Sequence, residues 1–142
     1  MDAAAKSITE TTVGAVMTTD PVTLQLNDTL RLADDMMNLV HVRHFPVFDG
    51  DKLVGVIDQD DLLHASMASF VRNPKDKVRA ALGAVAIKDF MKAAITVARE
   101  ASIYDAARMM VDRGIECLLV ADGDTLVGVV TRSDLLRELA KR

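Results

Sequence analysis

An internal repeat constrains the fold of this chain more than any other feature of its sequence. Residues 53–63 read LVGVIDQDDLL and residues 126–136 read LVGVVTRSDLL, so that seven of the eleven letters are identical. The same offset of 73 residues aligns residues 29–63 with residues 102–136 without a gap. Two copies in a chain of 142 residues predict a paired, pseudo-symmetric domain, because a solenoid is built from a longer array of repeats.

Each copy presents the same order of strand and helix signals. Residues 22–24 and 95–97 are short runs rich in β-branched residues, which predict a strand. Thr29 and Ser102 then occupy positions typical of helix N-caps, and apolar residues follow them at helical spacing. Gly114 is placed to end the second of these helices.

Each copy continues with a hairpin and a last helix. An Asp-Gly pair stands between two apolar runs in residues 45–57 and again in residues 117–130, which is a strong hairpin signal. Helical patterns follow from Asp58 and from Thr131. Each copy therefore predicts the element order βαββα, with a small three-stranded sheet.

The repeat predicts three segments along the chain. We expect the first repeat over residues 10–66, a connector over residues 67–86 and the second repeat over residues 87–142. Within the connector, Asn73-Pro74 is expected to break the preceding helix, and KDKVRAAL is expected to add one or two helical turns. The connector is neither Ser/Gly-rich nor of low complexity, so we expect it to be ordered.

Composition and charge limit the functions that this chain can have. Only 4% of the residues are aromatic while 50% are hydrophobic, so the core is expected to consist mainly of aliphatic side chains. The formal net charge of −4 argues against a nucleic-acid partner, because such proteins usually carry a basic stripe. A single cysteine, Cys117, excludes an intrachain disulfide. No signal peptide and no apolar run of membrane-spanning length is evident, so we expect a cytoplasmic protein without a membrane partner.

The segment GVVTRSD, residues 128–134, supports two interpretations. In the first, Thr131 caps a helix and Asp134 completes a capping box, which is a purely structural role. In the second, a phosphate binds at the helix start with help from the Thr131 hydroxyl, and the Asp134 carboxylate accepts hydrogen bonds from a ribose. Gly128 would let such a ligand approach the backbone.

Several motifs together resemble a known family. They are VGAVM at residues 13–17, IKDFM at residues 87–91, VRHFPVFD at residues 42–49, the two hairpins and the segment GVVTRSD. With these motifs the chain resembles a tandem pair of CBS domains, the cystathionine-beta-synthase type of module that is also called a Bateman module. The resemblance implies an α+β fold of two pseudo-symmetric βαββα repeats, packed through their small sheets with clefts between them.

The resemblance also implies a function and a set of site residues. Members of this family commonly bind AMP, ADP, ATP or S-adenosylmethionine and act as sensors rather than as enzymes, with a Thr on the phosphate and an Asp on the ribose. In the second copy, where two isoleucines could line a slot for the base, the expected site comprises Ile95, Thr96, Ile115, Thr131, Arg132 and Asp134. In the first copy, a weaker site is expected to use Asp61 and His44.

Asp58 departs from the family pattern, because it occupies the position that Thr131 has in the second copy. Together with Asp60 and Asp61 it places three carboxylates at one helix start. Two negative charges about 4 Å apart repel by about 4 kcal/mol at an effective dielectric constant of about 20, which is roughly a thousandfold in affinity. We therefore expect a phosphate to bind in the second copy alone, unless Mg²⁺ bridges it to these carboxylates.

The sequence thus predicts a stand-alone regulatory CBS pair that binds an adenosine ligand in a cleft between the repeats and passes the signal to an effector protein. We expect a homodimer, because both last helices carry leucine pairs that need cover. His41, His44 and His64 match no metal-ligand motif, and no catalytic motif is present, so neither a metal site nor an enzyme is expected. The alternative is a structural dimerisation module with empty clefts, in which Thr131 and Asp134 only cap a helix.

Overall fold

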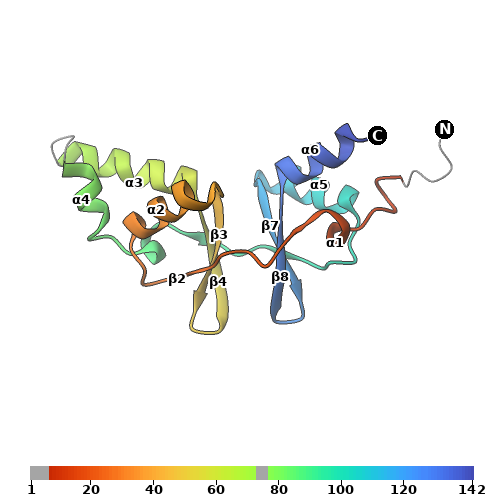
Figure 1. The fold of residues 1–142 in the computed structure, drawn as a ribbon, viewed down its shortest axis with the longest axis horizontal. Helices are drawn as coiled ribbons and strands as arrows, with labels where there is room; N and C mark the ends of the chain where they lie inside the picture. The colour runs from red at the N-terminus through yellow and green to blue at the C-terminus, as the bar shows by residue number, and fades with distance from the viewer. Residues whose placement is uncertain (1–6, 73–76) are drawn as a thin grey trace. The chain divides into compact units, whose positions relative to one another are not determined.

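The chain divides into two structural units, and each unit contains residues of both sequence repeats. The computed structural model describes residues 7–72 and 77–142 (Figure 1). Unit 1 consists of the N-terminal segment up to Pro21 together with Ile95–Arg142. Unit 2 consists of Val22–Ala94. The opening segment of each repeat therefore belongs to the unit that holds the rest of the other repeat.

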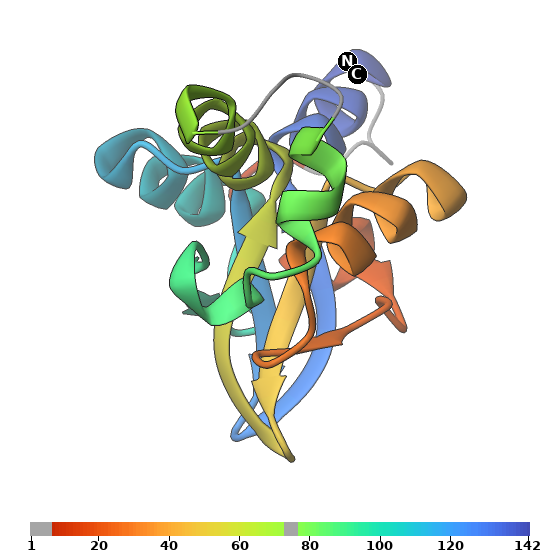
Figure 2. The same ribbon diagram turned by 90° about the vertical axis from the view of Figure 1, so that its left-hand side faces the viewer.

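Unit 2 is built on a sheet with the strand order β2-β3-β4-β5. Strand β2 runs parallel to β3, whereas the pairs β3–β4 and β4–β5 are antiparallel. The elements are β2 (Leu24–Gln25), α2 (Leu30–Val40), β3 (His44–Asp49), β4 (Lys52–Asp58), α3 (Gln59–Arg72), α4 (Val78–Leu82), the 3-10 helix η2 (Ile87–Asp89) and β5 (Lys92–Ala93). Figure 2 shows that the turn of the β3–β4 hairpin points away from the helices of this unit.

Unit 1 repeats this plan with the strand order β1-β8-β7-β6. Strand β6 runs parallel to β7, and the pairs β7–β8 and β1–β8 are antiparallel. The elements are α1 (Val13–Val16), β1 (Thr18–Thr19), β6 (Thr96–Val97), α5 (Ile103–Arg113), β7 (Cys117–Asp122), β8 (Thr125–Thr131) and α6 (Arg132–Ala140). The predicted order of strand, helix, hairpin and helix is thus confirmed in both repeats.

A short fourth strand extends the three strands that each repeat was expected to supply. Strand β5 pairs with β4, and β1 pairs with β8 at the corresponding edge of its sheet. Backbone hydrogen bonds fix this exchange of segments, because Ile87 N–H donates to Asp28 O (2.8 Å) in Unit 2 and Val13 N–H donates to Ala101 O (2.7 Å) in Unit 1. The expectation of three-stranded sheets is therefore wrong by one strand, which comes from the opening of the other repeat.

This fourth strand also explains the glycine in the repeated LVGV segment. A β-carbon on Gly128 would lie 2.7 Å from both Thr18 O and Met17 Sδ. A β-carbon on Gly55 would lie 2.6 Å from Lys92 O. The expectation that Gly128 leaves room for a ligand is therefore wrong, because the neighbouring strand fills that space.

The helices that follow the first strands begin at the predicted caps, and the second of them ends at the predicted glycine. The hydroxyls of Thr29 and Ser102 each accept the backbone N–H of the residue three positions further on, at 3.1 and 3.0 Å. Gly114 follows α5 in the left-handed conformation, with φ of 62°. His41 takes the same position after α2 with φ of 56°, a conformation in which its β-carbon is unfavourable.

The part of the connector that the structure describes is mostly helical, and residues 83–86 form the non-helical segment after α4. Residues 67–72 belong to α3, and α4 supplies the further helical turn that was expected. Asn73-Pro74, which was expected to break the preceding helix, lies outside the described residues. Within residues 7–72 and 77–142, no helix is both long enough and apolar enough to cross a membrane.

Each unit has its own hydrophobic core, and both cores are mainly aliphatic as predicted. In Unit 2, Leu30, Phe45 and Ile57 are completely buried between the sheet and its helices. In Unit 1, Val13 and Leu118 are completely buried in the corresponding cluster. The two cores hold the ends of β4 and β8 in place, and these are the points at which the last helices begin.

Candidate functional site

Thr131 and Asp134 hold the start of α6 in Unit 1. Strand β8 ends at Thr131, and α6 begins with the next residue. The backbone N–H of Thr131 donates to Asp134 Oδ2 (2.9 Å), and the backbone N–H of Asp134 donates to Thr131 Oγ1 (3.3 Å). These reciprocal bonds form a capping box, so the predicted cap is confirmed.

One oxygen of the Asp134 carboxylate is held inside the cap, because Oδ2 also accepts a hydrogen bond from the Thr131 hydroxyl (3.1 Å). Asp134 is only 8% exposed, and its Oδ1 accepts a hydrogen bond from Arg137 Nη2 (2.7 Å). The Arg137 side chain is itself 69% exposed. A ribose hydroxyl could replace this guanidinium on Oδ1 while Oδ2 keeps its bond to the Thr131 backbone, and the positive end of the helix dipole would favour a phosphate beside it.

The other second-copy candidates also lie in Unit 1, on and beside neighbouring strands. Thr96 is exposed on β6, which pairs with β7. Ile95 and Ile115 are half-buried and pack partly against the Unit 1 core. Arg132, the first residue of α6, forms an exposed ion pair with Glu116 at 2.9 Å. The structure thus brings Ile115, Thr131 and Arg132 to one end of the sheet, because β7 begins where β8 ends.

A groove formed by α5 and α6 adjoins these residues. Its volume is about 390 Å³, and its lining is mostly apolar. Leu136, which is 58% exposed, lies on its α6 side. The groove is lined by Ala107, Met110, Val111, Gly114, Ile115, Glu116, Arg132, Leu135, Leu136 and Leu139. Two candidate site residues, Ile115 and Arg132, therefore also border an apolar surface.

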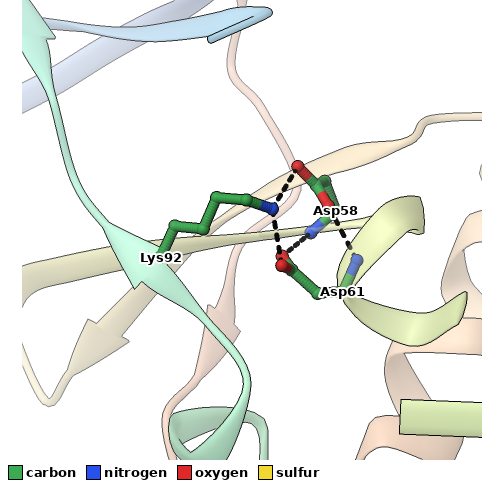
Figure 3. A network of polar contacts seen from close by, with 3 residues as sticks. All are labelled: Asp58, Asp61 and Lys92. Carbon is green, nitrogen blue, oxygen red and sulfur yellow. Dashed lines mark hydrogen bonds and ion pairs between the residues drawn. The ribbon is translucent and has the colours of Figure 1, made fainter. Parts of the chain in front are cut away.

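The start of α3 in Unit 2 carries a different arrangement, which Figure 3 shows. Asp58 N–H donates to Asp61 Oδ2 (2.9 Å), and Asp61 N–H donates to Asp58 Oδ1 (3.0 Å). The Lys92 ammonium, which comes from β5, donates to Asp58 Oδ2 (2.8 Å) and to Asp61 Oδ1 (2.5 Å). Every oxygen of the two carboxylates therefore accepts a hydrogen bond from within Unit 2.

Burial and hydrogen bonding set the protonation of this network. Burial disfavours the charged form of Asp58, but hydrogen bonds from Lys92 and from the Asp61 backbone outweigh it and lower the pKa of Asp58. Burial is the largest influence on Asp61 and raises the pKa of that carboxyl. Burial also opposes the charge on Lys92, yet its hydrogen bonds to both carboxylates raise the pKa of the ammonium.

The first-copy candidates have different surroundings from those of the second copy. Asp61 is 4% exposed, and its two carboxylate oxygens accept hydrogen bonds from the Asp58 backbone and from Lys92. His44 begins β3 and lies opposite Asp58 in the strand register. Among the described residues, no group of three or more His, Cys, Asp or Glu side chains is placed to hold a metal ion.

Sequence reasoning missed Lys92, although the repeat contains a signal for it. Lys92 follows Met91, which aligns with Met17 at the start of the other repeat. Lys92 therefore stands in Unit 2 where Thr18 stands in Unit 1. The register confirms this equivalence, since Thr18 pairs with Val129 and Lys92 pairs with the matching residue of β4, Val56.

The chain belongs to the CBS domain family. The model of the CBS domain matches residues 13–68 and again residues 87–141. A CBS domain-containing protein of Dictyostelium discoideum is 32% identical over 133 residues, which cover 91% of each chain. Protein MJ1232 of Methanocaldococcus jannaschii is 30% identical over 132 residues, which cover 92% of this chain and 40% of that protein. The chain thus spans less than half the length of MJ1232.

Solved structures support the same assignment. A crystal structure of AcuB from Vibrio cholerae is 31% identical, with a TM-score of 0.74 and coverage of 92% of this chain and 90% of that chain. The CBS domain pair of protein MJ0100, in complex with 5′-methylthioadenosine and S-adenosyl-L-methionine, is 25% identical with a TM-score of 0.74, and the match covers 91% of this chain and 99% of that chain. The α+β fold of two CBS repeats, which the sequence predicted, is confirmed.

Proposed function

We propose that this chain is a regulatory module that binds an adenosine ligand at the start of α6 in Unit 1 and passes the signal to an effector protein. The observation that carries this proposal is the pairing of Thr131 with Asp134. A neutral hydroxyl and one carboxylate stand at a helix start there, with the exposed Arg132 and Arg137 guanidiniums close in sequence. This combination suits a phosphate on the helix dipole and a ribose on Asp134.

The ligand is AMP, ADP, ATP or S-adenosylmethionine. The complex of the MJ0100 domain pair with 5′-methylthioadenosine and S-adenosyl-L-methionine supports an adenosine moiety as the common part. Ile95, Thr96 and Ile115 would contact the base beside Thr131. In Unit 2, His44 and Asp61 would form at most a weaker site.

The module acts by a shift of populations rather than by catalysis. A ligand that binds one arrangement of the chain more tightly than another favours that arrangement, and an effector protein can then distinguish the two. We propose that the chain works in the cytoplasm as a homodimer. The exposed Leu63 on α3 and Leu136 on α6, which are 56% and 58% exposed, would be covered in such a dimer.

Thermal unfolding with a panel of ligands tests the proposal. A ligand that binds the folded state alone stabilises it by about 2.7 kcal/mol at a concentration of about one hundred times its Kd. We expect AMP, ADP, ATP or S-adenosylmethionine to raise the Tm and GDP to do so less. Asp134→Asn should remove most of the shift, because the neutral side-chain amide replaces one carboxylate oxygen with an NH₂ group, which cannot accept a hydrogen bond from a ribose hydroxyl. Asp112→Asn, which changes an exposed carboxylate of α5 outside the candidate site, should keep it.

A structural dimerisation module is the second candidate function. The capping box is complete with protein atoms alone, and the apolar groove of α5 and α6 is a surface suited to another protein. The same unfolding experiment separates the two candidates. An unchanged Tm with all four ligands at millimolar concentration would support the structural module and contradict the proposed function.

A further inference from the structure

The Lys92 ammonium is the counter-ion of the two aspartates, Asp58 and Asp61, at the start of α3 in Unit 2. Its ammonium bridges Asp58 and Asp61, and the backbone N–H groups of both aspartates bind the remaining carboxylate oxygens. The Asp61 side chain is 5% exposed and that of Asp58 is 16% exposed, so these carboxylates lie away from solvent. Buried carboxylates need such a partner, because an unpaired buried charge is strongly unfavourable.

The two units carry different residues at two equivalent positions, which lie near the same end of each sheet. The cap residue is Thr131 in Unit 1 and Asp58 in Unit 2, and the residue on the added strand is Thr18 in Unit 1 and Lys92 in Unit 2. Both exchanges place a charge where the other unit has a neutral threonine. The two charges have opposite sign and bind each other at 2.8 Å, so the exchanges compensate one another.

We propose that the Asp58–Lys92 pair determines the ligand selectivity of Unit 2. The ammonium is a tethered counter-ion that allows the Asp58 carboxylate to cap α3, and this carboxylate closes the start of α3 to phosphate-bearing ligands. The inference rests on the proposed function, since it concerns the equivalent site of the other repeat. Two carboxylates and one ammonium leave a net negative charge at this helix start, so the ammonium does not attract phosphate while both aspartates hold it.

When Asp58 is replaced by a neutral residue, the Lys92 ammonium becomes available to bind a phosphate. In Asp58→Thr, the cap becomes the neutral one of Unit 1, and the ammonium keeps one carboxylate partner instead of two. The freed donor of Lys92 then faces the helix start from β5. A phosphate there would receive hydrogen bonds from the helix backbone, from the new hydroxyl and from the ammonium.

Calorimetric titration with ADP tests this inference in Unit 2. The wild-type chain is expected to bind one ADP, and Asp58→Thr is expected to bind two. The double variant Asp58→Thr with Lys92→Thr should bind the second ADP at least about tenfold more weakly than Asp58→Thr, a factor that corresponds to about 1.4 kcal/mol. A second site of equal affinity in both variants, or no second site in Asp58→Thr, would overturn the inference.

Introducing the equivalent aspartate and lysine into Unit 1 provides the matched control. Thr131→Asp should lower the Tm and abolish ADP binding in Unit 1. Adding Thr18→Lys should restore most of the lost Tm, because it recreates the counter-ion, and should leave ADP binding absent. Normal ADP binding by the Thr18→Lys, Thr131→Asp variant would show that the pair does not set selectivity.

The two proposals fail in different ways. A wild-type chain that binds no ADP and no other adenosine ligand contradicts the proposed function. In that case Asp58→Thr still decides the inference about Lys92, since a gain of one ADP supports it and the absence of a gain overturns it.

Discussion

At the scale of single residues, the charge at each helix start depends on the side chain that caps the helix and on the residue of the added strand that lies beside this cap. Thr131 gives α6 a neutral cap, whereas Asp58 gives α3 a charged one. The negative charge of Asp58 is tolerated because the Lys92 ammonium lies 2.8 Å from its carboxylate. The charge at the start of α3 is therefore set by Asp58 and Lys92 together.

Removing the ammonium should destabilise Unit 2 over a defined pH range. The pKa of Lys92 is raised above its usual 10.5, so its contribution is present below that pH and is lost as the pH rises through the folded pKa. The pKa of Asp58 is lowered below 3.8, so its contribution is present above that pH and is lost as the pH falls through the folded pKa. Lys92→Met should therefore cost stability between these limits.

We expect Lys92→Met to lower the free energy of unfolding by about 1 kcal/mol at pH 7, a modest value because the Lys92 side chain is 47% exposed and solvent screens the pair. Urea unfolding at pH 7 and at pH 11 measures the effect. The difference from wild type should shrink at the higher pH. Lys52→Met, at an exposed position next to the hairpin turn, is the control. Equal effects of the two substitutions would contradict the role of Lys92.

His41 holds a left-handed backbone conformation that costs folding stability. It follows α2 with φ of 56°, while Gly114 follows α5 with φ of 62°. We expect His41→Gly to raise the free energy of unfolding by about 0.5 kcal/mol, because relief of the left-handed strain exceeds the added flexibility of the unfolded chain. Gly114→His should do the reverse, by about 1 kcal/mol. Chemical unfolding of both variants checks this, and a less stable His41→Gly chain would count against it.

At the scale of helices and strands, the two units are completed by exchange of short segments. Strand β1 docks on β8, and β5 docks on β4, and in each case a glycine allows the close approach. Strand β1 lies so close to β8 that its backbone would block a side chain at Gly128, since Thr18 O lies 2.7 Å from the β-carbon position of Gly128.

Alanine in place of Gly128 should therefore lower the stability of the fold. We expect Gly128→Ala to destabilise the chain by about 1–3 kcal/mol, because the contact is with a backbone oxygen that cannot move aside without breaking the β1–β8 pairing. Gly50→Ala is a suitable comparison, since nothing lies within 4 Å of its β-carbon position and only its φ of 61° is unfavourable. Thermal unfolding should show the larger loss for Gly128→Ala, and a smaller loss would contradict the packing argument.

The sequence predicted the features that depend on neighbours along the chain. The caps at Thr29 and Ser102, the glycine end of α5 and the two hairpins follow from local signals and are confirmed. The fourth strands could not be predicted in this way. β1 and β5 contain two residues each and pair with distant segments, so no local periodicity marks them.

The same distinction applies to the candidate site. The capping box of Thr131 and Asp134 is local and was predicted. The Lys92 network was missed, because the lysine reaches Asp58 and Asp61 only after β5 docks on β4. The role first given to Gly128 was wrong for the same reason, since the strand that fills its space comes from elsewhere in the chain.

At the scale of the whole molecule, the chain is a pair of CBS domains whose exposed helices carry apolar side chains. Leu136 and Leu139 of α6 border the groove, and both are about half-exposed. A patch of this kind commonly marks an interaction site, and the proposed homodimer would cover it.

Leu136→Asp should therefore weaken self-association. We expect light scattering to give a dimer for the wild-type chain at micromolar concentration and a larger monomer fraction for Leu136→Asp, because a carboxylate in an apolar interface loses its hydration. Leu39→Asp, at a position 72% exposed on α2 and outside the groove, should remain dimeric. A wild-type chain that is strictly monomeric with and without nucleotide would contradict the dimer.

We propose that Unit 1 binds one adenosine ligand at Thr131 and Asp134. Calorimetric titration of the wild-type chain and of Thr131→Asp with ADP, in the absence of Mg²⁺, tests it most directly. We predict about one ADP per wild-type chain, and no binding by Thr131→Asp, because the new carboxylate would repel the phosphate by about 4 kcal/mol at an effective dielectric constant of about 20. Two equal sites in the wild-type chain, or unchanged binding by Thr131→Asp, would contradict a single adenosine site in Unit 1.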